Sequence, residues 1–280
     1  VASGSAKGKL EGKIAVITGG AQGFGFGIAE ELVKEGAVAA IADMNFSGAE
    51  IAADKLCSQY GKGKSFALQV NIADEASVEK MARDLVDICG GIDIFVANAG
   101  VLKAGPTKTF DKKDWSFVTD INYTGYFLCV KHISRVMSMQ NAESSDWTDI
   151  VQINSKSGLA GSNRNAAYAG SKFGTIGLTQ SFALELIEDK IKVNSICPGN
   201  FFDGPLWSDP VKGLFVQYLN SGKVPGAKTV EDVKKFYESK VPMNRGCFPV
   251  DVVRAIVYAV EQKYESGQAI PVTGGQVMLN

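Results

Sequence analysis

The sequence predicts an α/β fold, in which a single doubly wound domain contains a parallel seven-stranded sheet. Three observations support this prediction. Short apolar runs alternate with longer amphipathic runs, a glycine-rich turn follows the first apolar run, and 45% of the 280 residues are hydrophobic. Alternating strand and helix patterns are typical of parallel sheets, and this length is enough for one sizeable core.

The elements alternate regularly along the chain. In the first half we expect four strands, over 13–18, 38–42, 65–70 and 92–97. Each is followed by a helix: the first three helices cover 27–35, 48–60 and 75–89, and the fourth is a long stretch ending at Met139. In the second half we expect strands over 149–154, 192–196 and 268–272, and helices over 166–188 and 250–263. These seven strands would form one array in a single domain spanning residues 10–280.

One segment, 201–244, interrupts the alternation and is rich in proline, glycine and aromatic residues. It is short for a domain, and we interpret it as a small helical substrate lid. Its Phe201, Phe202 and Trp207 would either close over the substrate or pack the lid onto the core or another subunit. Residues 1–9 begin with valine and contain Gly, Ser and Lys, so we interpret them as a flexible leader, from a processed chain or from a longer polypeptide.

Composition excludes several classes of function. The 29 Lys and Arg and 30 Asp and Glu residues are interspersed and sum to −1, which gives no basic groove for nucleic acid. No apolar run approaches the roughly 18 residues of a membrane span, so we expect a cytoplasmic protein without membrane or nucleic-acid partners. A single histidine, His132, leaves no His-based metal site or Ser-His-Asp triad, so we expect no metal. Five cysteines without a C-x-x-C pair are expected to be reduced and buried.

A dinucleotide site is predicted at the first strand-to-helix turn. The turn contains Gly19, Gln22, Gly23, Phe24 and Gly25, and glycines there let the backbone approach a pyrophosphate at a helix N-terminus. A tight turn that binds no ligand would need the same glycines. Asp43 follows at the end of the second strand, where a carboxylate accepts hydrogen bonds from both ribose hydroxyls and repels a 2′-phosphate. NAD is therefore favoured over NADP, although Asp43 could also cap the next helix.

A candidate acid–base group lies in the second half. Tyr168 and Lys172 are four residues apart on a predicted helix and share one face, where an ammonium would lower the pKa of the phenol. Ser155 closes the fifth strand at the carboxyl edge of the sheet. Such a Tyr-Lys pair alone is common on solvated helix faces, so the prediction depends on all three residues.

With these residues in order, the chain resembles the NAD(P)-dependent short-chain dehydrogenases, which have a Rossmann fold, over about residues 10–280. The resemblance implies that Tyr168 is the general acid/base, that Ser155 binds the reacting oxygen, and that Lys172 lowers the tyrosine pKa and binds the nicotinamide ribose. It also implies that Asn122 holds a water linked to Lys172. The remaining residues that it places against the cofactor are Met44, Asn71, Ile72, Asn98, Ala99, Gly100, Pro198, Gly199 and Phe201.

Structural roles are the alternative for several of these positions: Asn98 could brace strands, Asn122 could mark a helix kink, and Pro198-Gly199 could be only a turn. Two positions depart from the family pattern. Asn71 stands where the family usually has Asp, and Asp203 stands where a Thr often contacts the nicotinamide carboxamide.

Longer strings narrow the resemblance to the sorbitol-6-phosphate 2-dehydrogenase branch, which converts sorbitol 6-phosphate to fructose 6-phosphate. They include Ile153–Gly158, Pro198–Phe202 and Thr273–Met278. A phosphorylated polyol needs cations at the pocket mouth, and the candidates are Lys103, Lys156, Arg164 and Arg245, each of which could instead be an ordinary surface cation. The end of the chain, 271–280, resembles the segment that joins subunits in the family, so a homotetramer is expected.

Two alternatives remain open at the level of function. The chain could oxidise an unphosphorylated polyol or a small secondary alcohol with the same catalytic residues. It could also be a non-catalytic NAD-binding redox sensor, although such a protein has no chemical need for Ser155, Tyr168 and Lys172 together.

Overall fold

A computed structural model describes residues 8–220 and 222–278 of the chain. Seven strands of this described part form one parallel sheet in the order β3-β2-β1-β4-β5-β6-β7. They are β1 (Ile14–Thr18), β2 (Val38–Asp43), β3 (Ser65–Gln69), β4 (Ile94–Ala97), β5 (Thr148–Ile153), β6 (Ile191–Pro198) and β7 (Ala269–Val272). The predicted doubly wound fold is confirmed, and the strand order reverses between β1 and β4, where such sheets bind ligands.

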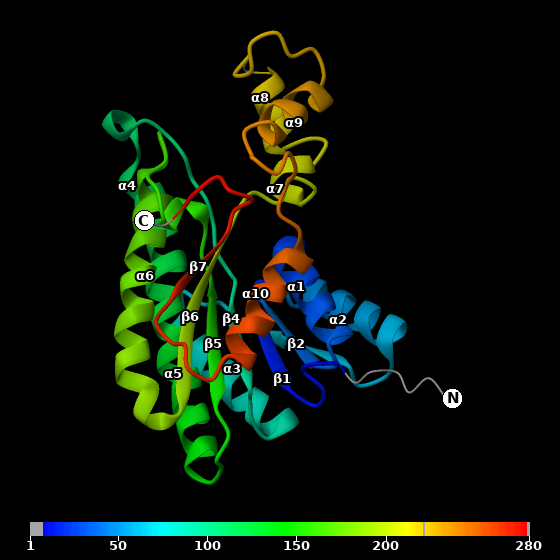
Figure 1. Cartoon of the computed structure of the whole chain (residues 1–280), viewed down its shortest axis with the longest axis vertical. Helices are drawn as coiled ribbons and strands as arrows, with labels where there is room; N and C mark the ends of the chain where they lie inside the picture. Colours follow the sequence, from blue (N-terminus) through cyan, green and yellow to red (C-terminus); the bar gives the residue numbers. More distant parts are fainter. Residues whose placement is uncertain (1–7, 221, 279–280) are drawn as a thin grey trace.

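Helices cover both faces of the sheet (Figure 1). Those in the described residues are α1 (Gly23–Lys34), α2 (Phe46–Tyr60), α3 (Glu75–Cys89), α4 (Lys112–Thr119), α5 (Gly125–Ala142), α6 (Ala166–Leu186), α7 (Pro205–Ser208), α8 (Leu214–Asn220), α9 (Val230–Glu238) and α10 (Pro249–Glu261). The connections from β1 to α1, from β2 to α2 and from β3 to α3 are short, which brings these helices back onto the faces of the sheet.

Two hydrophobic cores lie between the sheet and its helices. On one face Ile28, Leu56 and Ile256, from α1, α2 and α10, are fully buried against the strands. On the other face α3, α5 and α6 pack, with Met81 and Ile133 fully buried. Strands β5 and β6 are buried at every position, because helices cover a parallel sheet on both sides. This double core fixes the strand ends that carry the candidate site.

Two helix predictions differ from the structure. The first helix begins at Gly23 rather than at residue 27, because the amide of Phe26 already donates to the carbonyl of Gln22 at 3.2 Å. The long helix expected before Met139 is divided into α4 and α5 by a π turn over Asp120–Thr124, and residues 98–111 ahead of it are mostly irregular. The wider π turn buries Asn122, whose side chain bonds to the backbone of Val101.

The segment 201–244 contains the short helices α7, α8 and α9, which lie beyond the sheet on the side of α1 and α10 (Figure 1). These helices share a third hydrophobic cluster, in which Phe202, Trp207, Phe215 and Val233 are buried. The rings of Trp207 and Phe215 have centroids 5.2 Å apart. The segment therefore has a small core of its own.

A buried ion pair lies near the starts of β5 and β6, at the end of the sheet away from the strand ends of the candidate site, and connects the sheet to α10. Lys192 on β6 and Asp149 on β5 are 1% and 3% exposed, and Lys192 Nζ lies 2.9 Å from Asp149 Oδ1. The same ammonium donates to the carbonyls of Val260 at 3.2 Å and Gln262 at 3.0 Å, at the negative end of α10. Burial raises the pKa of Asp149 to about 6 even though Lys192 acts in the opposite direction.

Removing the ammonium should destabilise the protein strongly. We expect Lys192→Met to lower the free energy of unfolding by about 3–5 kcal/mol, because the Asp149 carboxyl stays buried without a charged partner. Urea unfolding followed by circular dichroism measures this loss.

The double variant Lys192→Met/Asp149→Leu is the control. It should recover much of the loss, since it leaves no lone buried charge, although the α10 carbonyls still lose their donor. Equal stability of the single and double variants would contradict the idea that the isolated carboxyl causes the effect.

Candidate active site

The glycine-rich turn after β1 folds tightly against the end of β4. Gly19 and Gly23 have φ values of +65° and +60°, which favour glycine. A Cβ on Gly19 would lie 2.9 Å from the Cα of Ala99, and one on Gly25 would collide with the Gly19 carbonyl. Gln22, the N-cap of α1, makes no side-chain hydrogen bond to the helix N-terminus. The turn therefore presents the first amides of α1 beside a backbone that side chains do not cover.

Hydrogen bonds between Thr18 and Asn98 hold this turn to the neighbouring loop. Asn98 Nδ2 donates to the carbonyls of Thr18 at 2.9 Å and Gly19 at 3.3 Å. Thr18 Oγ1 accepts from the backbone amides of Asn98 and Ala99, each at 3.1 Å. Asn98 thus braces the ends of β1 and β4, as the structural alternative expected, at the point where the strand order reverses.

The carboxylate of Asp43 lies beside the glycine-rich turn. Its Oδ2 accepts from the amide of Ala21 at 3.1 Å, and its Oδ1 accepts from the amide of Asn45 at 2.9 Å. The N-cap of α2 is Asn45, which accepts from Gly48, so Asp43 does not cap that helix. Met44 follows with 70% of its side chain exposed.

Asn71 and Ile72 follow β3 at the same edge of the sheet. The exposed Asn71 accepts at Oδ1 from the amide of Ala73 at 3.2 Å. Ile72 is buried against α5, where a Cβ on Gly125 would lie 2.9 Å from Ile72 Cδ1. Both residues therefore line the edge that also carries Asp43.

Ser155, Tyr168 and Lys172 come together at the carboxyl end of β5. The Ser155 side chain acts on the Tyr168 hydroxyl and lowers its pKa, and Lys172 Nζ lies 5.7 Å from the centroid of the Tyr168 ring. Lys172 is buried and donates to the carbonyl of Ile153 at 2.8 Å. Asn154 supports this arrangement, because its Nδ2 donates to the Lys172 carbonyl at 3.0 Å.

Burial changes the pKa of both titrating groups. It raises the pKa of Tyr168 above its ordinary value, while the Ser155 side chain acts in the opposite direction. It lowers the pKa of Lys172 to about 8, against a smaller opposing effect of Cys197. The expectation of a lowered tyrosine pKa is therefore not met in this structure, because loss of solvent around the phenol outweighs the stabilisation of the phenolate.

Asn122 lies in the π turn and faces the same region. Its Oδ1 accepts from the amide of Val101 at 2.8 Å, and its Nδ2 donates to the Val101 carbonyl at 2.9 Å and to Ser171 Oγ at 3.2 Å. Ser171 Oγ donates in turn to the carbonyl of Tyr168 at 2.8 Å. Asn122 thereby connects the loop after β4 to the helix that carries Tyr168.

The segment after β6 contacts the glycine-rich turn. Pro198 ends β6, and the amide of Gly199 donates to the carbonyl of Val272 at 2.9 Å. The rings of Phe24 and Phe201 then lie with their centroids 4.7 Å apart. Phe201 therefore packs the segment 201–244 onto the core at Phe24 of α1, which is one of its two expected roles.

Asp203, at the position where the family often has Thr, forms an ion pair with Lys234 of α9 at 2.7 Å. Its carboxylate is therefore engaged inside the segment 201–244.

The four candidate cations do not form one cluster in the structure. Arg245 makes two hydrogen bonds to Asp251, at 2.6 and 3.0 Å, and Lys103 lies 3.7 Å from Asp114. The backbone carbonyl of Arg164 accepts from Gly105 at 2.8 Å, and the residue adopts a φ of +56°. Lys156 is half-buried, and its pKa is lowered by burial and by the charge of Lys240.

The structure adds residues that sequence reasoning missed. Asn165, three residues before Tyr168, is 9% exposed, and its Oδ1 is buried without a hydrogen-bond partner. The positive charge of Lys240, 84 residues further along the chain, lowers the pKa of Lys156, and no spacing pattern could have revealed this. The position of Asn165 one helical turn before Tyr168 was the available signal for that residue.

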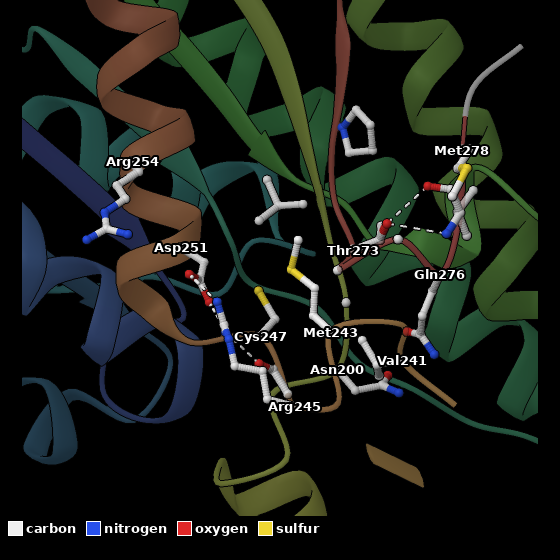
Figure 2. Close-up of a pocket in the computed structure, with 17 residues that line it drawn as sticks. Asn200, Val241, Met243, Arg245, Cys247, Asp251, Arg254, Thr273, Gln276 and Met278 are labelled. Carbon is white, nitrogen blue, oxygen red and sulfur yellow. Dashed lines mark hydrogen bonds and ion pairs between the residues drawn. The ribbon is translucent and has the colours of Figure 1, made fainter. Parts of the chain in front are cut away.

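A cavity of about 510 Å³ lies between the start of α10 and the end of the chain (Figure 2). Gly199, Asn200, Cys247, Thr273 and Gln276 are among its lining residues. It shares Gly199 with the expected cofactor residues and Arg245 with the expected substrate cations, and none of the expected catalytic residues lines it.

Within residues 8–220 and 222–278, no group of three or more His, Cys, Asp or Glu side chains could hold a metal ion, and no helix has the length and apolar character needed to cross a bilayer. All five cysteines are free thiols, of which Cys129, Cys197 and Cys247 are buried.

Comparisons with known proteins agree with this geometry. The family model of short chain dehydrogenases matches residues 13–206. Sorbitol-6-phosphate 2-dehydrogenase of Escherichia coli strain K12 is 35% identical, over 95% of this chain and 99% of that protein. The 3-oxoacyl-[acyl-carrier-protein] reductase of Aquifex aeolicus is 29% identical, over 95% of this chain and 98% of that protein.

A solved structure leads to the same family. The crystal structure of sorbitol-6-phosphate 2-dehydrogenase from Erwinia amylovora superposes with a TM-score of 0.85 and 40% identity, over 95% of this chain and all of that one. The family match covers more than half of the chain, and the first of the relatives above exceeds 30% identity over nearly its whole length. The chain therefore belongs to the short-chain dehydrogenases, oxidoreductases that use a nicotinamide cofactor.

Proposed function

We propose that this protein is an NAD-dependent dehydrogenase that interconverts sorbitol 6-phosphate and fructose 6-phosphate. The observation that carries the proposal is the group of Ser155, Tyr168 and Lys172 at the carboxyl end of β5. The similarity to sorbitol-6-phosphate 2-dehydrogenases over nearly the whole chain supports this substrate.

The residues at the strand reversal fit a dinucleotide. A Cβ on Gly25 would fill the space beside Gly19, and the start of α1 has amides without a side-chain cap. We assign the pyrophosphate to these amides and to Gln22, Gly23 and Phe24. Asn98, Ala99, Gly100, Asn71, Ile72 and Met44 would line the adenosine, and Pro198, Gly199 and Phe201 the nicotinamide.

Asp43 supports NAD over NADP. Its carboxylate accepts two backbone hydrogen bonds, from Ala21 and Asn45, and these hold it in place at the end of β2. A carboxylate fixed there binds ribose hydroxyls and repels a 2′-phosphate. We assign adenosine-ribose recognition to Asp43.

The chain's own residues supply the proton chemistry, and the bound cofactor supplies the hydride acceptor or donor. Tyr168 would exchange the proton with the substrate oxygen, and Ser155 would hydrogen-bond that oxygen. Burial keeps the Tyr168 phenol protonated, ready to donate to a ketone, so alcohol oxidation should become faster as pH rises. Lys172 would place positive charge beside the phenol, and Asn122 would hold a water on the path from Lys172 to solvent.

We extend the proposal to a homotetramer in the cytoplasm. Support comes from apolar side chains exposed on α5 and α6, where Phe127, Phe173 and Leu184 are 42%, 47% and 82% exposed. Exposed apolar side chains of this size favour contact with another protein surface.

Initial rates with alternative substrates test the proposed function. We expect NADH formation with sorbitol 6-phosphate and NAD, and much slower reaction with NADP or with sorbitol, xylitol or mannitol 1-phosphate. Absorbance at the reduced-cofactor band measures these rates. Activity only on a phosphate-free polyol would refute the proposed substrate and leave the catalytic assignment standing.

Removing the Tyr168 hydroxyl should abolish proton exchange. We expect Tyr168→Phe to reduce kcat about 10²- to 10⁴-fold, while NADH binding, followed by fluorescence titration, stays close to wild type. The matched control is Tyr126→Phe, because this buried hydroxyl bonds Thr179 at 3.1 Å, away from Ser155. A Tyr168→Phe protein with full turnover would overturn the mechanism.

Lys172 should carry a stability cost that depends on pH. Its folded pKa of about 8 lies below its ordinary value of 10.5, so the unfolded chain binds the proton more tightly and wild-type stability rises between these pH values. We expect the inactive variant Lys172→Met to have a larger free energy of unfolding than wild type at pH 7. This stability gap between the two proteins should narrow by at most about 1.4 kcal/mol per pH unit toward pH 10.

Urea unfolding from pH 7 to 10 measures this gap. The control is Lys62→Met, an exposed lysine for which no such pH-dependent gap is expected. A gap for Lys172→Met that stays constant over this range would show that burial of the charge is not its cause.

A further inference from the structure

Asn154 is a buried polar residue that directly precedes Ser155 and has no part in the mechanism described above. Its backbone amide donates to the carbonyl of Ile196 on β6 at 2.7 Å, so the sheet fixes its main chain. Its side chain bonds to groups on β5 and on α6. A buried amide needs partners for both its oxygen and its nitrogen, and Asn154 has them on two elements of the candidate site.

The side-chain oxygen of Asn154 holds the backbone of Ser155. Asn154 Oδ1 accepts from the amide of Ser155 at 2.8 Å. Ser155 Oγ accepts in turn from the amide of Ser157 at 3.1 Å, at the start of a short 3₁₀ turn. One hydrogen bond therefore fixes the main chain of Ser155 and another fixes its side chain, and Asn154 supplies the first.

The side-chain nitrogen of Asn154 holds the helix that carries Lys172. Asn154 Nδ2 donates to the carbonyl of Lys172 at 3.0 Å and to Thr175 Oγ1 at 3.2 Å. Thr175 Oγ1 donates to the same Lys172 carbonyl at 3.0 Å. All three residues are buried, so these bonds are shielded from competing water. They tie α6 to the end of β5 at the position of Lys172.

The ammonium of Lys172 returns to the same part of β5. Lys172 Nζ donates to the carbonyl of Ile153 at 2.8 Å, and this carbonyl belongs to the peptide that joins Ile153 to Asn154. The main chain of Lys172 is thus bonded to the side chain of Asn154, and its side chain is bonded to the peptide just before Asn154. Both ends of the lysine are therefore positioned by one short piece of β5.

Gln152 determines which way the Asn154 amide points. Gln152 Oε1 accepts from Asn154 Nδ2 at 3.0 Å and from Ser195 Oγ at 3.0 Å, and Gln152 and Ser195 are paired in register across β5 and β6. Reversing the Asn154 amide would place its oxygen against the Gln152 oxygen and the Lys172 carbonyl, and its nitrogen against the Ser155 amide. One orientation alone satisfies every group.

We propose that Asn154 is a positioning residue that sets where the Ser155 hydroxyl lies relative to the Lys172 ammonium. The inference deepens the proposed function and rests on it for the catalytic roles of Ser155 and Lys172. Asn154 acts through these two neighbours, because its own side chain is buried between them. A displacement of about 1 Å in a catalytic group can slow a reaction about 10²-fold, so loss of Asn154 should appear in kcat.

Removing the Asn154 amide tests this role. We expect Asn154→Ala to lower kcat for oxidation of sorbitol 6-phosphate with NAD about 10- to 100-fold, with KM changed less than about threefold. Thr175→Val is a milder variant that keeps the shape of the side chain and removes one partner of Asn154. It should lower kcat in the same direction by a smaller factor, and it keeps the test available if Asn154→Ala folds poorly.

Asn141→Ala is the matched control. Asn141 is equally buried, and its Nδ2 donates to Thr148 Oγ1 at 2.9 Å and to the carbonyl of Asp189 at 3.0 Å. These contacts lie at the start of β5, away from Ser155. The variant should lose stability as Asn154→Ala does and keep kcat within about twofold of wild type. Equal kcat values in Asn141→Ala and Asn154→Ala would overturn the proposal.

Urea unfolding at pH 7 and pH 10 gives a readout that needs no substrate. Burial of the Lys172 ammonium makes wild-type stability rise between these pH values. We expect Asn154→Ala to flatten this rise, because water entering the vacated space solvates the ammonium and moves the pKa of Lys172 back toward its ordinary value. The titratable groups beside Lys172, Tyr168 on α6 and Cys197 on β6, are the same in all the variants.

The stability gap between wild type and Asn154→Ala should therefore widen toward pH 10, whereas the gap for Asn141→Ala should stay constant. This outcome separates the inference from the proposed function. If sorbitol 6-phosphate is not a substrate but the gap widens for Asn154→Ala alone, the proposed function fails and the positioning role stands. A gap for Asn154→Ala that does not widen would show that Asn154 is only structural, as Asn141 is.

Discussion

The hydrogen bonds between Thr18 and Asn98 are the constraint on which the candidate site depends. They join the ends of β1 and β4 at the one place where the strand order reverses. Because the side-chain Nδ2 of Asn98 also donates to the Gly19 carbonyl, the glycine-rich turn has a fixed shape before any ligand binds. A preformed backbone surface of this kind lets a dinucleotide bind without a large ordering cost.

The catalytic group depends on a second set of buried polar contacts. Asn154 donates to the carbonyl of Lys172 and to Thr175, and its Oδ1 accepts from the amide of Ser155. A Cβ on Gly158 would collide with Asn154 Oδ1, so the close approach of the backbone to Asn154 requires glycine at this position. Fully satisfied networks of this type fix rotamers, and they hold Ser155 and Lys172 at defined positions.

Much of the fold and part of the site could be predicted from the sequence, for physical reasons. Parallel strands buried on both faces leave continuous apolar runs, and a tight turn requires glycine, so both features are visible locally. The spacing of Tyr168 and Lys172 is visible for the same reason, because a helix places residues four apart on one face. Pairings between distant segments leave no local pattern. Asp203 illustrates this, since only the structure shows its carboxylate paired with Lys234, 31 residues further along the chain. The π turn at Asn122 and the burial that raises the pKa of Tyr168 likewise arise from packing between segments far apart in sequence.

The separate hydrophobic cluster of the segment 201–244 has an evolutionary consequence. Its buried residues, Phe202, Trp207, Phe215 and Val233 among them, form a core distinct from the two that hold the sheet. Substitutions in this cluster can reshape the segment while the β1 and β4 strand ends and the helix α6 stay intact, because their free-energy effects fall on different packing units. Under the proposed function, selection can therefore change which alcohol is accepted without rebuilding the residues at the strand ends. A scaffold divided in this way can diversify its substrates within one conserved chemistry.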